Sequence, residues 1–345
     1  MSYLSKEIHQ QPEVLGRLLE GQAETAARIA AAIQARDVRY AVFAARGTSD
    51  NAARYAQYLF GATVGLPVAL ATPSLFSIYR TPPRLRDALV LGVSQSGQSP
   101  DIVAVVEEGG RQGALTVAVT NEASSPLAQA CDHVLLLNAG QERAVAATKT
   151  YTAELATLAL LAVQLAADDE RRAALRRVPE AVERTLALEE QIALAAQRYT
   201  YATECVVLGR GYNYATAFEI ALKMKELTYI VTEPYSSADF RHGPVAVVER
   251  GFPAVVVAPQ GAVYADILKL ARELAGREAE LIVISEQDEA LELAHTPLRL
   301  PAPLPEWLSP FTCVIPGQLL ALHITMAKGY DTDQPRGLSK VTETR

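Results

Sequence analysis

The sequence has few of the residues that build metal sites and disulfide frameworks. Its 345 residues include three cysteines and five histidines. Cys131, Cys205 and Cys313 lie far apart and are odd in number, and the histidines have no metal-ligand spacing. We therefore expect free thiols in a reducing cytoplasm and no metal or nicotinamide cofactor. The opening MSYLSKEIHQQPEVL has charges where a secretory signal peptide would have its apolar core, which favours the same location.

Positive charge is also in deficit. The 32 lysines and arginines are outnumbered by 39 acidic residues, which gives a net charge of -7. Without a basic stripe, the sequence argues against nucleic acid and an anionic membrane surface as partners, and leaves small molecules or proteins. Residues 151–167 form the most apolar helical stretch that we identify, but they contain Glu154 and Gln164 and are short for a membrane span. We expect a core helix there.

What the sequence does contain is an internal repeat. The segments YAVFAARGTSDNAARYAQYLF and ECVVLGRGYNYATAFEIALKMKEL each predict an apolar strand, an Arg-Gly turn and a helix. Gly47 corresponds to Gly211, and the same offset places Gly97 on Gly261. In each half a second apolar strand, a glycine turn and a helix follow. The strands expected after them are residues 115–120 and 133–138 in the first half, and residues 281–285 and a strand near Leu298 in the second.

Apolar strands that alternate with helices predict parallel sheets covered on both faces. The fold class is therefore α/β, with two doubly wound parallel-sheet subdomains related by duplication. The helical stretch from Thr148 to about Ala196 should break near Pro179. The expected parts are a helical N-terminal lead (1–36), subdomain 1 (37–168), a linking helix (169–196), subdomain 2 (197–326) and a C-terminal tail (327–345).

The motif SQSGQSP, residues 94–100, lies where an apolar strand turns into a helix. Ligands of open parallel sheets bind beyond the carboxyl ends of the strands. Backbone N–H groups at a helix start, serine hydroxyls and a glycine that permits close approach together favour a phosphate. Thr48 and Ser49, at the first glycine turn, should lie on the same edge of the sheet and bind the phosphate or sugar hydroxyls.

Comparison of the two halves indicates that the geometry of this loop does not depend on its hydroxyls. The corresponding loop of the second half, residues 258–263, keeps the glycine and has no hydroxyl. The fold therefore does not require the hydroxyls of Ser94, Ser96 and Ser99. A structural alternative is that Ser99 is only an N-cap with Pro100 at the first helical position, which accounts for one serine.

Candidate acid–base groups lie in the second half. Glu219, Lys223 and Glu226 fall on one stripe of a largely apolar helix, so Lys223 should lie between two carboxylates. The alternative is an exposed row of salt bridges. His242 lies in DFRHGP, a loop expected between the Glu226 helix and a strand at Ala254, where a surface histidine is the alternative to a catalyst.

Taken together, these stretches resemble the sugar isomerase (SIS) domain pair of glucosamine-6-phosphate synthase, and a stand-alone form similar to SIS-type glucosamine-6-phosphate deaminases. The resemblance rests on RGTSDNA, SQSGQSPDI, AVAATKTY, GRGYNYATAFEIALKMKEL, SSADFRHGP and DQPRGLSKVTET, which keep the family's order through nearly the whole chain. It implies that both subdomains are flavodoxin-like three-layer sandwiches.

The resemblance also implies roles for individual residues. Glu226 would move a proton between C1 and C2, and Lys223 would help to position Glu226. His242 would open the sugar ring across a homodimer interface, and Lys340 on the tail would face the open-chain carbonyl. The substrate-binding set would be Ser94, Gln95, Ser96, Ser99 and Ser49 at the phosphate, with the Val145 backbone at the sugar.

The chain departs from the synthases at three positions. Ser2 stands where glutamine-dependent members have a cysteine nucleophile, so we expect no glutamine-derived nitrogen. Gln98 replaces an acidic residue and Ala147 replaces a serine, which could change the preferred sugar. We therefore expect an enzyme that converts glucosamine 6-phosphate to fructose 6-phosphate and ammonia. The alternatives are an SIS enzyme for another aminosugar phosphate and a non-catalytic phosphosugar sensor.

Overall fold

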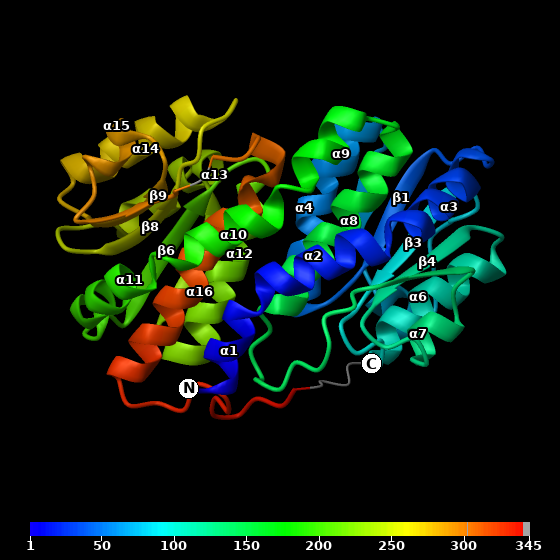
Figure 1. The fold of residues 1–345 in the computed structure, drawn as a ribbon, viewed down its shortest axis with the longest axis horizontal. Coiled ribbons are helices and arrows are strands. Elements are labelled where there is room, and N and C mark those ends of the chain that lie inside the picture. The colour runs from blue at the N-terminus through cyan, green and yellow to red at the C-terminus, as the bar shows by residue number, and fades with distance from the viewer. Residues whose placement is uncertain (302, 341–345) are drawn as a thin grey trace. The chain divides into compact units, whose positions relative to one another are not determined.

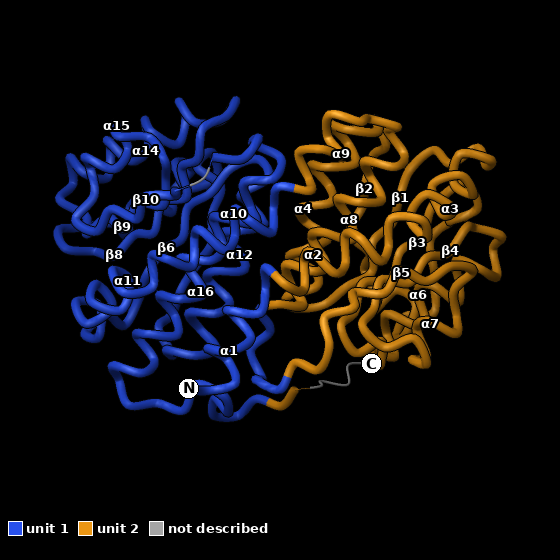
Figure 2. Tube along the Cα trace, viewed as in Figure 1, with its two compact units in different colours: residues 1–12, 143–148, 177–338 blue, residues 13–142, 149–176, 339–345 orange. Residues whose placement is uncertain are grey.

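The structure is a computed structural model that describes residues 1–301 and 303–340. The chain divides into two compact units (Figure 2). Unit 1 contains Met1–Pro12, Arg143–Thr148 and Arg177–Leu338, and unit 2 contains Glu13–Glu142, Lys149–Arg176 and the described residues from Ser339 on. The end of the expected tail, residues 341–345 (VTETR), lies outside the described residues.

Unit 2 is built around a five-stranded parallel sheet in the order β2-β1-β3-β4-β5, of which β1, β3 and β4 are labelled in Figure 1. Its strands are β1 (Tyr40–Ala44), β2 (Val68–Leu70), β3 (Ala88–Val93), β4 (Leu115–Thr120) and β5 (His133–Leu136). Its helices are α2 (Gln11–Gly21, which starts in unit 1), α3 (Ala23–Gln34), α4 (Gly47–Val64), α5 (Ser74–Ser77), α6 (Pro100–Arg111), α7 (Pro126–Gln129), α8 (Lys149–Ala166) and α9 (Asp169–Leu175).

Alternation along β1 decides what covers each face of this sheet. Val42 and Ala44 belong to a buried cluster with Ile102 of α6. Phe43 points to the opposite face, where its ring meets Phe60 of α4 edge-on with the centroids 5.5 Å apart. Helices α3 and α4 both pack on α8. The sheet is therefore buried on both faces, which explains why its central strands are continuously apolar.

Unit 1 repeats this plan with the order β10-β9-β8-β6-β7. Its strands are β6 (Glu204–Gly209), β7 (Val231–Ser236), β8 (Pro253–Val257), β9 (Glu280–Ser285) and β10 (Thr296–Arg299). Its helical segments are α1 (Tyr3–His9), α10 (Val178–Leu186), α11 (Glu189–Ala196), η1 (Gln197–Tyr199), α12 (Asn213–Lys223), the π-helical turn η2 (Met224–Thr228), α13 (Ser237–Arg241), η3 (Pro244–Val247), α14 (Tyr264–Gly276), α15 (Asp288–Leu291), η4 (Glu306–Leu308) and α16 (Ser309–Ala327).

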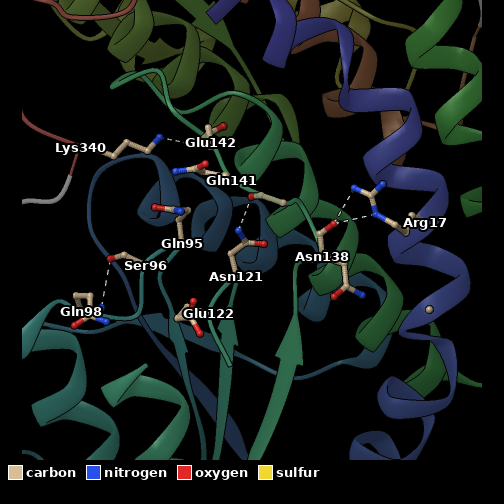
Figure 3. Close-up of a pocket in the computed structure, with 12 residues that line it drawn as sticks. Arg17, Gln95, Ser96, Gln98, Asn121, Glu122, Asn138, Gln141, Glu142 and Lys340 are labelled. Carbon is tan, nitrogen blue, oxygen red and sulfur yellow. Dashed lines mark hydrogen bonds and ion pairs between the residues drawn. The ribbon is translucent and has the colours of Figure 1, made fainter. Parts of the chain in front are cut away.

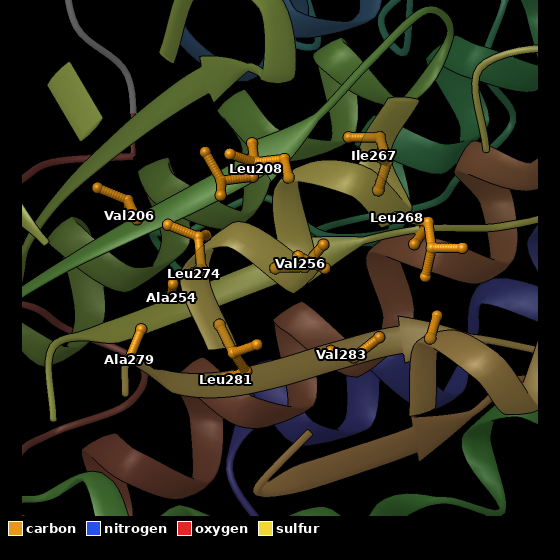
Figure 4. Packing of buried hydrophobic residues seen from close by; sticks show 14 of the residues in the cluster. Val206, Leu208, Ala254, Val256, Ile267, Leu268, Leu274, Ala279, Leu281 and Val283 are labelled. Carbon is orange, nitrogen blue, oxygen red and sulfur yellow. The ribbon is translucent and has the colours of Figure 1, made fainter. Parts of the chain in front are cut away.

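Both faces of this second sheet are covered as well. On one face, Leu208, Val256 and Val283 of three neighbouring strands pack with Ile267 and Leu274 of α14 (Figure 4). Helices α12 and α16 pack on each other, α12 contacts β6 and β7, and α16 contacts β9. The two units are therefore doubly wound three-layer sandwiches with the same strand order, which confirms the predicted fold class.

The predicted strands are present, but each sheet has one strand that the sequence analysis missed. These are β2 and β7, and both are edge strands. β2 has three residues, and β7 has exposed and half-buried positions and contains Pro234, so neither has the continuous apolar run of a central strand. The helical stretch from Thr148 to Ala196 is interrupted three times, once just before Pro179 at the junction of α9 and α10.

Helix α8 is a core helix, as expected, with almost every residue buried. Among the described residues, one helical segment, Glu306–Ala327, is long and apolar enough to cross a membrane, with a mean hydropathy of 1.3. In the structure 83% of that apolar window is buried inside the protein, as in the core helix of a soluble protein.

Candidate active site

The two glycine turns of unit 2 lie at one edge of its sheet. β1 pairs with β2 on one side and with β3 on the other, so the strand order reverses between β1 and β3. Thr48 and Ser49 follow β1, and residues 94–100 follow β3. The carboxyl ends of such neighbouring strands form the usual ligand crevice of a doubly wound sheet. The predicted placement of these turns on a common edge is confirmed.

The serines of the SQSGQSP loop organise its backbone. The Ser94 hydroxyl oxygen accepts a hydrogen bond from the Gly97 N–H at 3.1 Å, and that of Ser96 accepts from the Gln98 N–H at 3.3 Å. Ser99 is the N-cap residue of α6, but its side chain makes no capping hydrogen bond. The N-cap alternative therefore does not account for the Ser99 hydroxyl.

Gly97 is required by its own surroundings in the protein. Its φ of +63° is in the left-handed region, and a Cβ at this position would lie 2.2 Å from the Ser125 hydroxyl oxygen. The Thr120 hydroxyl would be 3.0 Å away. The glycine is thus required by the fold, because a side chain here would collide with the protein's own Ser125 and Thr120.

The Thr48-Ser49 turn is partly enclosed. Ser49 is buried, and its hydroxyl donates to Glu154 Oε1 at 2.7 Å, whereas Thr48 is half-buried. To donate to a phosphate instead, Ser49 would have to release Glu154. Burial raises the pKa of the neighbouring Asp50 above its ordinary value, although Arg54 and Arg46 act in the opposite direction.

A cavity of about 780 Å³ lies beside the SQSGQSP loop (Figure 3). Of the predicted site residues, Gln95, Ser96 and Lys340 line it. The Lys340 Nζ lies 2.8 Å from Glu142 Oε2, and this carboxylate also accepts from the Thr150 hydroxyl at 2.7 Å. The Glu142 side chain is completely buried, so the ion pair fixes the tail lysine at the cavity wall.

The remaining wall of the cavity consists of residues that were not predicted to bind substrate, although Gln98 was noted as a position that could change the preferred sugar. They are Arg17, Gly21, Gln98, Asn121, Glu122, Asn138, Gly140, Gln141 and Glu142. Asn121 and Glu122 directly follow β4, and Asn138 comes two residues after β5. The strand-end rule that located the SQSGQSP loop would have found these three, because polar residues that follow parallel strands share one edge of the sheet.

In unit 1 the predicted carboxylate–lysine group is assembled at the end of α12. Lys223 Nζ lies 3.5 Å from Glu219 Oε1 and 2.6 Å from Glu226 Oε2. The side chains of Glu219 and Lys223 are buried, at 0% and 1% exposure, whereas Glu226 is 23% exposed. The predicted position of Lys223 between two carboxylates is confirmed, and the alternative of an exposed row of salt bridges is wrong.

Glu226 is presented by an irregular part of the helix. α12 ends at Lys223, and the chain continues as the π-helical turn η2 to Thr228, followed by Tyr229 in a left-handed conformation. π-helical turns are rare and occur often at functional sites. The periodicity of an ideal helix could not predict this turn, although it brought Glu226 close to Lys223.

His242 and Val145 also belong to unit 1. His242 is exposed and follows α13, where its backbone N–H donates to the Asp239 carbonyl at 3.0 Å. The segment before it is therefore not a plain loop, because β7 and α13 lie between Glu226 and His242. The backbone N–H of half-buried Val145 donates to the Asp333 carbonyl at 3.1 Å. Lys340 and the phosphate-loop residues belong to unit 2.

The model of the SIS domain matches residues 36–164 and again residues 199–328. The chain belongs to the SIS-domain family. The two matched segments carry Gly47 and Gly211 at corresponding places, so the repeat that is visible in the sequence is a pair of SIS domains.

Relatives of this SIS protein include enzymes of sugar-phosphate metabolism. It is 36% identical to the glutamine–fructose-6-phosphate aminotransferase (isomerizing) of Thermus thermophilus over 98% of its own length and 58% of the relative's. A candidate phosphosugar isomerase from Silicibacter pomeroyi DSS-3 has a TM-score of 0.86 at 36% identity, with 96% of this chain and all of that chain covered. The chain thus spans somewhat more than half of the curated relative it matches.

A more distant similarity concerns the fold alone. The glucosamine-6-phosphate deaminase of Thermotoga maritima has a TM-score of 0.80 at 22% identity, with 99% of this SIS chain and 100% of that chain covered.

Within residues 1–301 and 303–340, no group of three or more histidine, cysteine and acidic side chains is arranged to hold a metal ion.

Proposed function

We propose that this SIS protein is an enzyme that converts glucosamine 6-phosphate to fructose 6-phosphate and ammonia in a reversible reaction. The observation that carries the proposal is the buried Lys223 between two carboxylates, one of which, Glu226, remains partly exposed. A protein that only sensed a phosphosugar would have no need of this group. The relationship to an isomerizing aminotransferase named for fructose 6-phosphate supports the substrate class.

The proposed chemistry needs opening of the sugar ring, a shift of two protons and one hydrolysis. His242 opens the sugar ring, which leaves an aldehyde at C1 and the amino group on C2. Glu226 removes the C2 proton and returns it to C1, and Lys223 holds its carboxylate in place. A second proton passes from the amino group to O1, near the positive charge of Lys340, so that C1 becomes a hydroxymethyl group and C2 carries an imine. Water then adds to C2 and the C–N bond breaks, which releases ammonia and leaves the ketone.

The substrate phosphate is assigned to the edge of the unit 2 sheet. Hydroxyls, backbone amides and the start of α6 are the groups that bind phosphate well. Gln95 and Ser96 line the cavity there. The proposed binding set is Ser94, Gln95, Ser96 and Ser99, with Thr48 and Ser49 at the neighbouring turn and the Val145 backbone at the sugar.

We also propose a cytoplasmic homodimer in which His242 of one copy completes the site of the other. A shared site would explain an exposed histidine in a catalytic role, since exposure in one chain is then burial in the assembly. Sedimentation of the purified protein at enzymatic concentrations would test the dimer, and a monomer with full activity would contradict the shared site.

The reaction is tested by incubating purified protein with glucosamine 6-phosphate and measuring ammonia and fructose 6-phosphate separately. We expect equal amounts of both, without added metal or nicotinamide. Glu226→Gln should lower kcat by about 100-fold or more and change KM little, because a general base acts mainly in the transition state.

Two parallel reactions separate the competing functions. Fructose 6-phosphate with glutamine tests nitrogen transfer from an amide, and fructose 6-phosphate alone tests simple isomerisation to an aldose phosphate. Binding of these sugar phosphates without turnover in any of the reactions would mean that the protein is a sensor and not an enzyme.

A further inference from the structure

Three consecutive backbone amides of the Val145 segment are held by the two ends of the chain. The N–H groups of Arg143 and Ala144 donate to the two carboxylate oxygens of Glu7, the latter at 3.2 Å. The next N–H, that of Val145, donates to the Asp333 carbonyl at 3.1 Å. All five residues belong to unit 1.

Glu7 is held in this position by its helix. α1 carries Leu4 and Ile8, both fully buried, and it contacts α16. The first turn of α1 is fixed by the Asp333 carboxylate, which accepts from the N–H groups of Tyr3 at 2.9 Å and Leu4 at 2.8 Å. Asp333 therefore binds α1 through its side chain and Val145 through its backbone. The helix and the tail form one clamp around the segment.

The Glu7 carboxylate is well matched to this task. Only 4% of the residue is exposed, and a buried carboxylate is costly unless hydrogen bonds compensate it. Hydrogen bonds from amides to a charged acceptor are stronger than neutral ones, and here two oxygens meet two neighbouring amides. A glutamine could accept only one of them, because its NH₂ group would face the other N–H.

The clamp determines which backbone group of Val145 can contact a ligand. Because the Val145 N–H is engaged by Asp333, the backbone group of Val145 that can meet a sugar hydroxyl is its carbonyl oxygen. That carbonyl belongs to the peptide plane between Val145 and Ala146, which directly follows the three planes whose N–H groups Glu7 and Asp333 hold. Two of these three N–H groups are fixed by Glu7.

We propose that Glu7 is a positioning residue that holds the Val145 backbone for the sugar of the substrate. The inference rests on the proposed function, because it assumes that the Val145 backbone contacts the sugar. Glu7 itself has no chemical role in the reaction. Its loss should weaken substrate and transition state alike, which raises KM and leaves kcat nearly unchanged.

The test compares Glu7→Gln with Glu280→Gln. Glu280 is a matched control, since it is also a nearly buried carboxylate of unit 1, but its partners are Arg198 and Tyr199. In Glu7→Gln we expect about a 10-fold higher KM for the sugar phosphate, equivalent to about 1.4 kcal/mol. Hydrogen exchange should become faster in the peptide that contains residues 141–148. Glu280→Gln should change neither quantity, even if it lowers the melting temperature.

Asp333→Asn serves as a second variant if Glu7→Gln does not fold. It weakens the attachment of α1 and should also raise KM and exchange in the same peptide. Unchanged exchange in the folded variants would overturn the clamp. Faster exchange with unchanged KM would overturn the positioning role. If the wild-type protein turned over no sugar phosphate, the proposed function would fail, whereas the exchange measurement would still test the clamp.

Discussion

The SQSGQSP loop of unit 2 and the APQGAV loop of unit 1 occupy corresponding positions in the same fold. They differ in the groups that lie at their backbone amides. Each follows the third strand of its sheet, β3 or β8, and precedes a helix. In the second loop, the Ala262 N–H donates to Glu306 Oε2 at 2.9 Å and the Gln260 N–H to Glu286 Oε1 at 2.6 Å. Carboxylates are the kind of group that such amides attract. The amides of the second loop are thus occupied by the protein's own carboxylates, whereas for the first loop we propose an external anion.

An ion pair beside each loop is common to both units. This shared feature distinguishes what the fold requires from what ligand binding requires. Arg46 pairs with Asp101 at 2.8 Å in unit 2, and Arg210 pairs with Asp266 at 2.9 Å in unit 1. In each unit this ion pair connects the turn after the first strand to the helix after the third. Because it occurs in both copies, we attribute it to the fold. The serines occur in one copy, and we attribute them to binding.

Among the variants that test this comparison, Gly97→Ala should have the largest effect. The new Cβ would collide with Ser125, and its backbone has a φ of +63°. Backbone strain and overpacking should together lower the free energy of unfolding by about 2–4 kcal/mol. We also expect KM for the sugar phosphate to rise by roughly 100-fold, since the loop backbone must move.

The control for Gly97→Ala is Gly261→Ala. Its Cβ would lie 2.2 Å from Glu306 Cδ, at the end of a partly exposed side chain that can rotate away. Denaturant unfolding and steady-state kinetics would show a smaller loss of stability and an unchanged KM. Equal effects on KM in both variants would remove the functional distinction between the loops.

The sequence predicted the central strands, the repeat and the strand-end location of the loop, because each depends on local patterns of apolar residues and glycine. It also predicted Lys223 between its carboxylates, since helical spacing brings these residues together. It missed β7, whose edge position allows Pro234 and exposed side chains. It could not predict that Glu142 holds Lys340 or that Glu7 holds residues 143 and 144, because these contacts join distant parts of the chain.

A smaller effect is expected from Ser96→Ala. The hydroxyl oxygen of Ser96 accepts from the Gln98 N–H, and its hydrogen is then available to donate to a phosphate. Removing a hydrogen bond to a charged group should raise KM by about 10-fold or more, with little change in kcat. Steady-state kinetics with glucosamine 6-phosphate would measure this change. A change confined to kcat would show that Ser96 acts on the reacting carbons and not on the phosphate.

The smallest effect, and the sharpest test of the comparison, is expected from Glu306→Ala. This change removes the carboxylate from the Ala262 N–H and leaves Glu286 on the Gln260 N–H. The free energy of unfolding should fall by about 1 kcal/mol, as for one hydrogen bond at a partly exposed site. Calorimetric titration with inorganic phosphate should still find at most one binding site per chain, because the vacated loop has no hydroxyls and keeps a neighbouring negative charge. A second site of similar affinity would mean that the backbone amides suffice for binding, and that Glu306, rather than the lost serines, keeps phosphate out of unit 1.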